Sequence, residues 1–119
     1  MPQILPVPHA LDDVPREPVA ADRLLSGQPT QAVANAFSSP DARFHCGVWE
    51  ADAGAWRVHY TEHEFCHLIA GRLRLRGDDG EESVWEAGQS FVVPAGFSGT
   101  WEVLAPARKL YAIYEPPGD

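Results

Sequence analysis

The stretch "GQSFVVPAGFSGTW", residues 88–101, has the pattern of a short strand held between two sharp turns. Gly88 and Gly96 flank the apolar segment, and glycine readily adopts the positive φ values that tight turns need. Pro94 ends the segment, because proline has no backbone N–H to donate to a neighbouring strand. The stretch therefore predicts a corner in a protein built from β-strands.

Short apolar segments separated by turn residues continue on both sides of this corner, at the spacing typical of sandwiches and barrels. Gly71 separates two of these segments, and the turn "APAR" at 105–108 separates the last two. No connection is long enough for a parallel crossover, so the pattern predicts an antiparallel sandwich or barrel. We expect strands near residues 44–50, 55–60, 64–70, 72–76, 82–86, 90–93, 99–103 and 109–114.

Proline is concentrated near the start of the chain. This density excludes a helix interior and a central strand, so we expect an extended arm over residues 1–22 and a single domain over residues 23–119. Between residues 23 and 43 we expect one irregular strand between two turns. The arm could lie on its own domain, reach a second subunit or remain a flexible tail. The prolines are Pro2, Pro6, Pro8, Pro15 and Pro18.

The chain is acidic, with a formal net charge of −8 from 17 acidic and 9 basic residues. A nucleic acid would be repelled by most of such a surface, so we expect no nucleic-acid partner. No apolar run approaches the ~18–20 residues that span a bilayer, and the start of the chain lacks the pattern of a signal peptide. These observations predict a cytoplasmic protein with no membrane partner. Cys46 and Cys66 are too few for a disulfide framework and are expected to be buried free thiols.

Four stretches carry a resemblance to a known family: "GVWEADAG" (47–54), "EFCHLIAG" (64–71), "AGQSFVVPAGFSGTW" (87–101) and "RKLYAIYE" (108–115). Over residues 22–115 the chain resembles the cupin superfamily of RmlC-like jelly rolls. More narrowly, it resembles the small cupins grouped with the (S)-ureidoglycine aminohydrolase cupin domain and the ethanolamine-utilisation cupins. The resemblance implies an antiparallel double-stranded β-helix and a homodimer. The aminohydrolase itself resembles a two-cupin chain with an intact manganese site, which makes that particular activity a poor match.

The first cupin motif is a His-x-His pair followed, after three or four residues, by a glutamate. Anchored on Glu64, the longer spacing places the two histidine positions at Arg57 and His59. The shorter spacing places them at Val58 and Tyr60. Only one histidine of the pair is therefore present.

The second cupin motif places its histidine at Gly99, so that ligand is missing as well. A complete site uses three imidazoles and one carboxylate, a set suited to manganese, iron, nickel or zinc. This chain keeps His59 and Glu64, so no cofactor is firmly indicated and a divalent transition metal would need a replacement ligand. By strand alternation Cys66 shares the face of Glu64 and His67 points away, unless a bulge reverses them. The candidate replacement ligands are His45, His63, Cys66 and His67.

The resemblance implies that Arg57, His59 and Glu64 point into one barrel mouth. His59 would then serve as a base or metal ligand, Glu64 as an acid or metal ligand, and Arg57 would hold a substrate carboxylate. Alternatively, Arg57 and Glu64 form an ion pair that only satisfies two inward charges. Further pocket residues are expected to be Tyr60, Cys66, Trp101 and Tyr111.

Two functions remain open at this point. The first is binding of a small polar nitrogenous or carboxylated metabolite in the barrel, with hydrolysis or isomerisation as the reaction class if the protein is an enzyme. The second is a non-enzymatic ligand-sensing or structural homodimer. The extended arm suits strand addition to the sheet of a neighbouring subunit.

Overall fold

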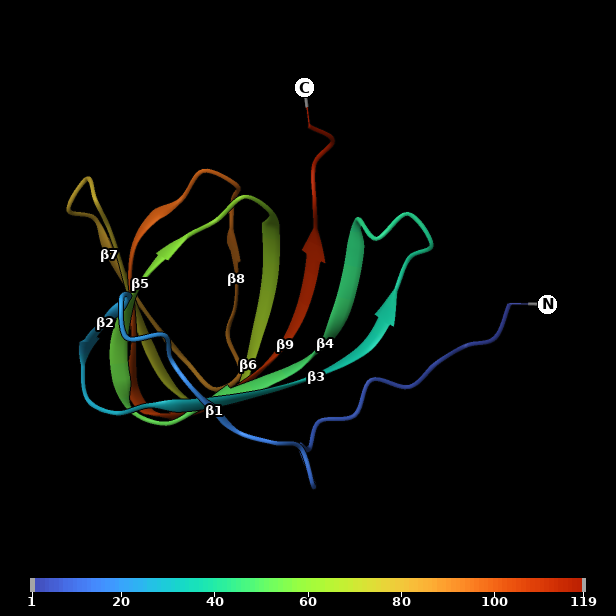
Figure 1. Cartoon of the computed structure of the whole chain (residues 1–119), viewed down its shortest axis with the longest axis horizontal. Coiled ribbons are helices and arrows are strands. Elements are labelled where there is room, and N and C mark those ends of the chain that lie inside the picture. Colours follow the sequence, from blue (N-terminus) through green and yellow to red (C-terminus); the bar gives the residue numbers. More distant parts are fainter. Residues whose placement is uncertain (1, 119) are drawn as a thin grey trace.

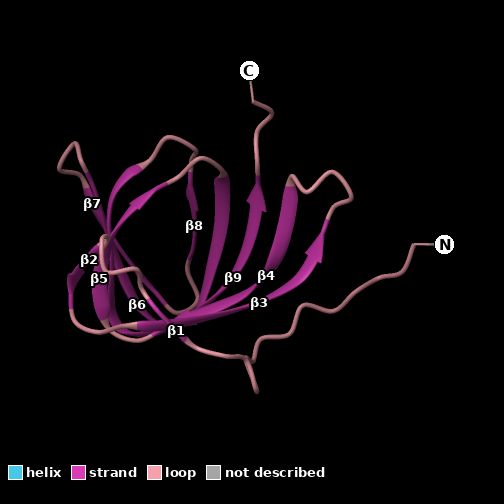
Figure 2. Cartoon of the chain, viewed as in Figure 1, coloured by secondary structure: helices cyan, strands magenta, loops and turns pink. Residues whose placement is uncertain are grey.

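The structure, a computed structural model, describes residues 2–118. These residues form strands and no helix, so none of them belongs to a helix that could span a membrane (Figures 1 and 2). The strands are β1 (Glu17–Pro18), β2 (Leu24–Ser26), β3 (Thr30–Ser38), β4 (Phe44–Ala51), β5 (Gly54–His59), β6 (His63–Gly77), β7 (Glu82–Glu86), β8 (Ser90–Val93) and β9 (Ser98–Tyr114).

All strand pairs are antiparallel, and β9 is the centre of the sheet. One edge of β9 pairs with β5 in its first part and with β4 in its last part, while the other edge pairs with β6. Strand β6 continues to β7 and β8, and β4 continues to β3 and β1. The sheet curls around its own interior (Figure 1), which confirms the predicted antiparallel jelly roll.

Two predicted interruptions are absent because the long strands bend without ending. The predicted strands at 64–70 and 72–76 form the single strand β6, and β9 runs straight through the predicted turn at 105–108. Gly71 has φ +85°, and the β6–β9 register shifts on both sides of it, as expected at bulges. A Cβ atom on Gly71 would overlap the carbonyl oxygen of Pro106 on β9. Glycine and proline therefore bend this strand pair where the local sequence indicated turns.

The N-terminal arm joins the sheet only at its end. Pro18 and Glu17 pair with the start of β3, and Val19 is buried in the core. Arg16 donates hydrogen bonds to Thr30 and forms an ion pair with Asp52 (3.2 Å). Residues 2–16 form no strand, and the start of the arm trails away from the barrel in Figure 1. The region predicted to hold one irregular strand contains both β2 and β3.

Alternating inward residues fill the barrel. All four tryptophans belong to or pack against the core, with Trp56 and Trp101 buried and the other two half-buried. Trp101 meets Trp49 edge-to-face, with ring centroids 5.9 Å apart. Among the described residues, the buried charged side chains are Glu64 and Lys109. Burying charge is costly unless it is paired, so these two residues mark the place to look for function.

Candidate binding site

Strands β6 and β9 each point one charged side chain into the barrel. On β6, Glu64 and Cys66 are buried whereas His67 lies on the other face, where its Nδ1 is 2.7 Å from Ser90 Oγ. Strand alternation therefore places Cys66 beside Glu64, as the sequence predicted. On β9, Lys109 is only 5% exposed.

Lys109 and Glu64 form a buried ion pair. The Lys109 Nζ atom lies 2.8 Å from Glu64 Oε2, and the Tyr60 hydroxyl donates a 2.7 Å hydrogen bond to Glu64 Oε1. The same ammonium lies 3.7 Å from Cys66 Sγ and 4.3 Å from the centroid of the Trp101 ring. Cation–π contact and charge-assisted hydrogen bonds thus compensate for the lost hydration of the lysine.

The surroundings hold each of these groups in one protonation state near neutral pH. Burial alone would raise the pKa of Glu64, but the Lys109 charge and the hydrogen bonds from Lys109 and Tyr60 outweigh it and lower that pKa. Burial alone would lower the pKa of Lys109, but its interactions with Cys66 and Glu64 raise it. Burial raises the pKa of Cys66 to about 12, and burial with the Glu64 charge raises the pKa of Tyr60. The pair is therefore charged, and the thiol and phenol are neutral.

The contribution of this ion pair to the free energy of unfolding is expected to stay constant over a broad pH range around neutrality. We compare the native protein with a Glu64→Met/Lys109→Met variant by urea unfolding. The contribution of Glu64 is fully present above its ordinary pKa of 4.5 and is lost as pH falls through its lower folded-state pKa. The contribution of Lys109 is fully present below 10.5 and is lost as pH rises through its higher folded-state pKa. If the difference in free energy of unfolding between the two proteins changes near pH 7, the conclusion that both groups are charged at neutral pH is wrong.

The ion pair lies in the wall of a cavity of about 260 Å³. Four strands contribute to it: β3, β4, β6 and β9. Aromatic and aliphatic side chains form most of the wall, and polar groups lie among them. The lining residues are Val33, Asn35, His45, Trp49, Glu64, Lys109, Tyr111 and Ile113.

A chain of hydrogen bonds orients the other polar groups of this cavity. The Tyr111 hydroxyl donates to Asn35 Oδ1 (2.8 Å), and Asn35 Nδ2 donates to Ser38 Oγ (2.8 Å). Ser38 Oγ lies 2.7 Å from His45 Nδ1, and His45 Nε2 lies 3.0 Å from the Ala42 carbonyl oxygen. A carbonyl only accepts, so we assign the proton to Nε2 and the Ser38 hydroxyl as donor to Nδ1. The wall is thus held in one arrangement before any ligand arrives.

The predicted trio of Arg57, His59 and Glu64 does not share one mouth. On β5, Trp56 and Val58 pack in the core, so the residues between and after them point outward. His59 is exposed, and Arg57 forms a 2.7 Å surface ion pair with Asp78. The prediction of a shared mouth is therefore wrong, and so is the alternative of an Arg57–Glu64 pair. The shorter motif spacing, which places Val58 and Tyr60 inward, matches the structure.

The predicted pocket residues divide into two groups. Tyr111 lines the cavity, whereas Tyr60, Cys66 and Trp101 contact the ion pair from the core side. Lys109 was missed, because it stood at the boundary between a predicted turn and a predicted strand. Strand alternation could have indicated that Lys109 points inward, since Ala107, Lys109 and Tyr111 are all buried on one face of β9.

The donor set does not fit a transition metal. Among residues 2–118, no three His, Cys, Asp or Glu side chains are grouped so that they could hold a metal ion. Glu64 is the one motif ligand that points inward, and its carboxylate already binds the Lys109 ammonium. At the second motif, a Cβ on Gly99 would overlap the Arg76 carbonyl oxygen, so the backbone leaves no room for a ligand side chain. The Lys109 ammonium thus lies beside the Glu64 carboxylate, where a complete motif would bind a metal ion.

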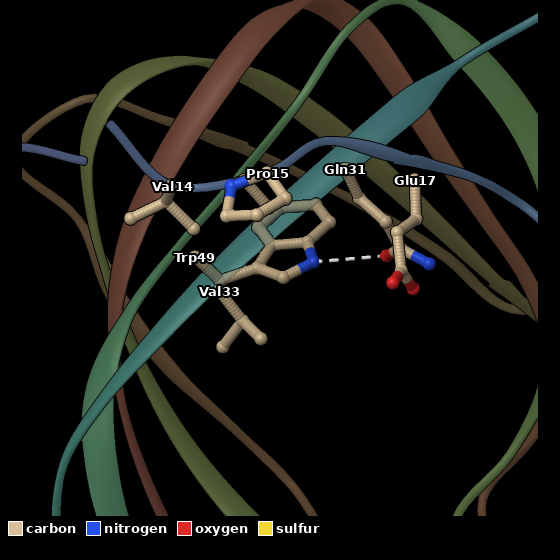
Figure 3. Close-up of a pocket in the computed structure, with 7 residues that line it drawn as sticks. Val14, Pro15, Glu17, Gln31, Val33 and Trp49 are labelled. Atoms are coloured by element: carbon tan, nitrogen blue, oxygen red, sulfur yellow. Dashed lines mark hydrogen bonds between the residues drawn. The ribbon is translucent and has the colours of Figure 1, made fainter. Parts of the chain in front are cut away.

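A larger cavity, of about 420 Å³, lies beneath the N-terminal arm (Figure 3). Val14 and Pro15 of the arm lie near the Trp49 indole, whose Nε1 donates a 3.0 Å hydrogen bond to Gln31 Oε1 (Figure 3). This cavity shares Val33 and Trp49 with the smaller one but holds no buried charge. The chemistry is concentrated at the ion pair, so we take the smaller cavity as the candidate site.

An antiparallel jelly roll that encloses the motif glutamate defines a small cupin. Residues 38–111 match the EutQ-like cupin domain family, and the chain belongs to this family. No curated protein matches the chain.

Solved structures share this fold. The EutQ protein of Clostridium difficile is 22% identical with a TM-score of 0.66, covering 73% of this chain and 64% of that one. A DUF861 family protein of unknown function from Pseudomonas syringae pv. tomato str. DC3000 is 24% identical with a TM-score of 0.77, covering 87% and 45%. A putative ethanolamine utilization protein Q from Salmonella typhimurium LT2 is 18% identical with a TM-score of 0.65, covering 81% and 76%. The chain thus spans less than two thirds of the length of the first two proteins, and the likeness concerns the fold alone.

Proposed function

We propose that the 260 Å³ cavity binds a small polar metabolite whose head group is uncharged overall but dipolar, such as a carboxamide, a ureido group or a zwitterionic amino acid. The observation that carries this proposal is the buried Lys109–Glu64 pair in the cavity wall. The pair is neutral as a unit, so an anionic or cationic ligand would bring an uncompensated charge into a buried site. A dipolar head group instead offers an acceptor to the ammonium and a donor to the carboxylate.

The pair keeps hydrogen-bonding capacity for such a ligand. A carboxylate has about four acceptor positions, and the bonds from Tyr60, Lys109 and the Cys66 thiol use three on Glu64. An ammonium has three donors, and contacts with Glu64 and Cys66 use two on Lys109. One donor position on Lys109 and about one acceptor position on Glu64 therefore remain for a ligand.

The size and lining of the cavity support a metabolite of few atoms. Its volume of about 260 Å³ lies below the ~300–1,000 Å³ of pockets for drug-sized ligands. Val33, Trp49 and Ile113 offer apolar surface for a short carbon chain or a ring. Asn35 and Tyr111 are held in place by their mutual hydrogen bond, which reduces the entropic cost of binding.

The protonation states favour binding without turnover over hydrolysis or isomerisation. A general acid or base works best when its pKa lies near the working pH. The pKa of Glu64 is lowered, while those of Lys109, Tyr60 and Cys66 are raised, so none of the four moves towards neutrality. We therefore propose a ligand-sensing or ligand-storing cupin, and we place it in the cytoplasm, where its two free thiols stay reduced.

The test uses four probes of similar size: propionamide, β-alanine, propionate and propylammonium. We expect calorimetry and amide chemical-shift changes to detect propionamide and β-alanine, with propionate and propylammonium at least about tenfold weaker because of their net charge. The Glu64→Met/Lys109→Met variant should lose this binding, whereas Glu102→Gln, at a half-exposed pair with Arg74, should keep it. Equal binding of propionate and propionamide, or binding unchanged in the double variant, would refute the proposal.

A further inference from the structure

The two cavities of the barrel are adjacent and share part of their walls. Val33 and Trp49 line both cavities, and these two residues lie directly opposite each other in the β3–β4 register. The smaller cavity continues from them to Asn35 and the buried ion pair, and the larger cavity continues to Gln31 and the N-terminal arm. From Asn35 back to Gln31, strand β3 spans about 13 Å. The two cavities therefore form one elongated groove along β3.

The N-terminal arm forms a fixed wall at its end of this groove. Val14 and Pro15 line the larger cavity (Figure 3), and Arg16 directly after them anchors the arm to the sheet. Its guanidinium donates hydrogen bonds to the hydroxyl (2.9 Å) and the carbonyl oxygen (3.0 Å) of Thr30, and it lies 3.2 Å from Asp52 Oδ1. This wall is in place before a ligand arrives, so binding does not have to order it. The cavity beneath it, of about 420 Å³, lies within the ~300–1,000 Å³ of ligand pockets.

The middle of the groove is apolar. Val33 is 54% exposed there, which is unusual for a valine that lines a cavity. Trp49 is half-buried, and its Nε1 already donates a 3.0 Å hydrogen bond to Gln31 Oε1, so its indole offers apolar surface to the groove. Each methylene group that a ligand buries against this surface tightens binding by up to about fourfold. This part of the groove therefore suits a hydrocarbon chain.

A carboxylate lies at the arm end of the groove. Glu17 is paired with Gln31 in the β1–β3 register and lines the larger cavity beside it (Figure 3). Its acidic neighbours Glu50 and Asp52 both contact Arg16, whereas Glu17 has no ion pair within residues 2–118. Because Glu17 is exposed, a cation bound there remains in contact with water, unlike a charge brought to the buried ion pair. This end of the groove therefore favours a cationic group.

We propose that the protein binds an elongated ligand with a dipolar head group, an apolar chain and a cationic end group. The head group lies at the Lys109–Glu64 pair, as in the proposed function on which this inference rests. The chain lies along Val33 and Trp49, and the cationic end lies at Glu17. Basic α-amino acids such as lysine have this chemistry, because a zwitterionic head offers its carboxylate to the Lys109 ammonium and its ammonium to Glu64.

Three α-amino acids with the same head group separate the parts of this ligand. Alanine has almost no chain, norleucine has an apolar chain, and lysine has a chain of the same carbon length that ends in an ammonium. We expect calorimetry to show norleucine bound at least about fivefold more tightly than alanine, because its longer chain is buried in the groove. Amide resonances of Val14 and Gln31, which line only the larger cavity, should shift with norleucine and lysine but not with alanine.

Two variants test the cationic end group. An ion pair with an exposed carboxylate strengthens binding only modestly, so we expect native protein to bind lysine about threefold to fivefold more tightly than norleucine. Glu17→Gln should remove this preference and leave the affinity for norleucine unchanged. Glu81→Gln is the matched control, because it removes the same charge from an exposed position between β6 and β7 and should retain the preference. This control separates a contact at Glu17 from general attraction of lysine to a chain of net charge −8.

The results distinguish this inference from the head-group proposal. Norleucine that binds no more tightly than alanine, or a lysine preference that is absent, that survives Glu17→Gln or that is lost equally in Glu81→Gln, would overturn the inference. Alanine binding would in each of these cases leave the head-group proposal intact. Both proposals are wrong if none of the three amino acids binds to the native protein.

Discussion

Lys109→Met is expected to lower the free energy of unfolding by about 3–5 kcal/mol, as measured by urea denaturation followed by tryptophan fluorescence. The variant leaves the Glu64 carboxylate buried, with the Tyr60 hydroxyl as its remaining hydrogen-bond donor besides the thiol of Cys66. An uncompensated buried charge is far more costly than the loss of the pair itself. The free energy of unfolding of a small domain is about 5–15 kcal/mol, so this loss is a large part of the total stability.

A second variant keeps this prediction testable even if Lys109→Met does not fold. Glu64→Met/Lys109→Met removes both charges together, and we expect its stability to lie within about 2 kcal/mol of the native protein. Glu102→Gln breaks the half-exposed pair with Arg74 and should cost less than about 1 kcal/mol. The interpretation fails if the double variant is as unstable as Lys109→Met, because the loss would then come from packing and not from the unpaired charge.

Gly99→Ala is expected to destabilise the protein by about 3 kcal/mol, the upper end for overpacking a core. The added Cβ would overlap the Arg76 carbonyl oxygen and lie 2.9 Å from Gly77 Cα on β6. Both contacts are with backbone, which cannot rotate away as a side chain can. Gly99→His, which restores the histidine of the second cupin motif, should be at least as unstable and should not build a metal site.

The control separates crowding from backbone conformation. Gly80 has φ +91° but open space around its missing Cβ, so Gly80→Ala should cost only about 1–2 kcal/mol. Thermal and urea unfolding of the two alanine variants gives the comparison. A Gly99→Ala protein as stable as the native one would show that β6 and β9 separate easily, and the missing motif histidine would then need another explanation.

Most of the barrel was predictable because its strands follow local rules. Strands β7 and β8 match their predicted ranges of 82–86 and 90–93, and β4 differs by one residue. The two longest strands were each divided in the prediction, at Gly71 and at Pro106. Glycine and proline have the same local effect in a turn and in a bulge, so only the pairing between β6 and β9 distinguishes the two.

Within the candidate site, the inward Glu64 and the companion Cys66 followed from alternation along one strand. Alternation could not identify Lys109 as the partner of Glu64, because an ion pair between two strands depends on the register in which they pair. Glu64 is paired with Ile113 and Leu68 with Lys109, and this register brings the lysine side chain to the carboxylate. The motif spacing allowed both His59 and Tyr60 as inward positions. In the structure Tyr60 is the inward residue, and its hydroxyl donates a hydrogen bond to Glu64.

By itself, the sequence determined an all-β antiparallel cupin with an incomplete set of motif ligands, because turn residues and two-residue alternation act over a few neighbouring positions. The tertiary structure alone decided which cation meets Glu64 and which spacing of the first motif applies. Each of these depends on strands that are distant in sequence and adjacent in space, and no local pattern contains that information.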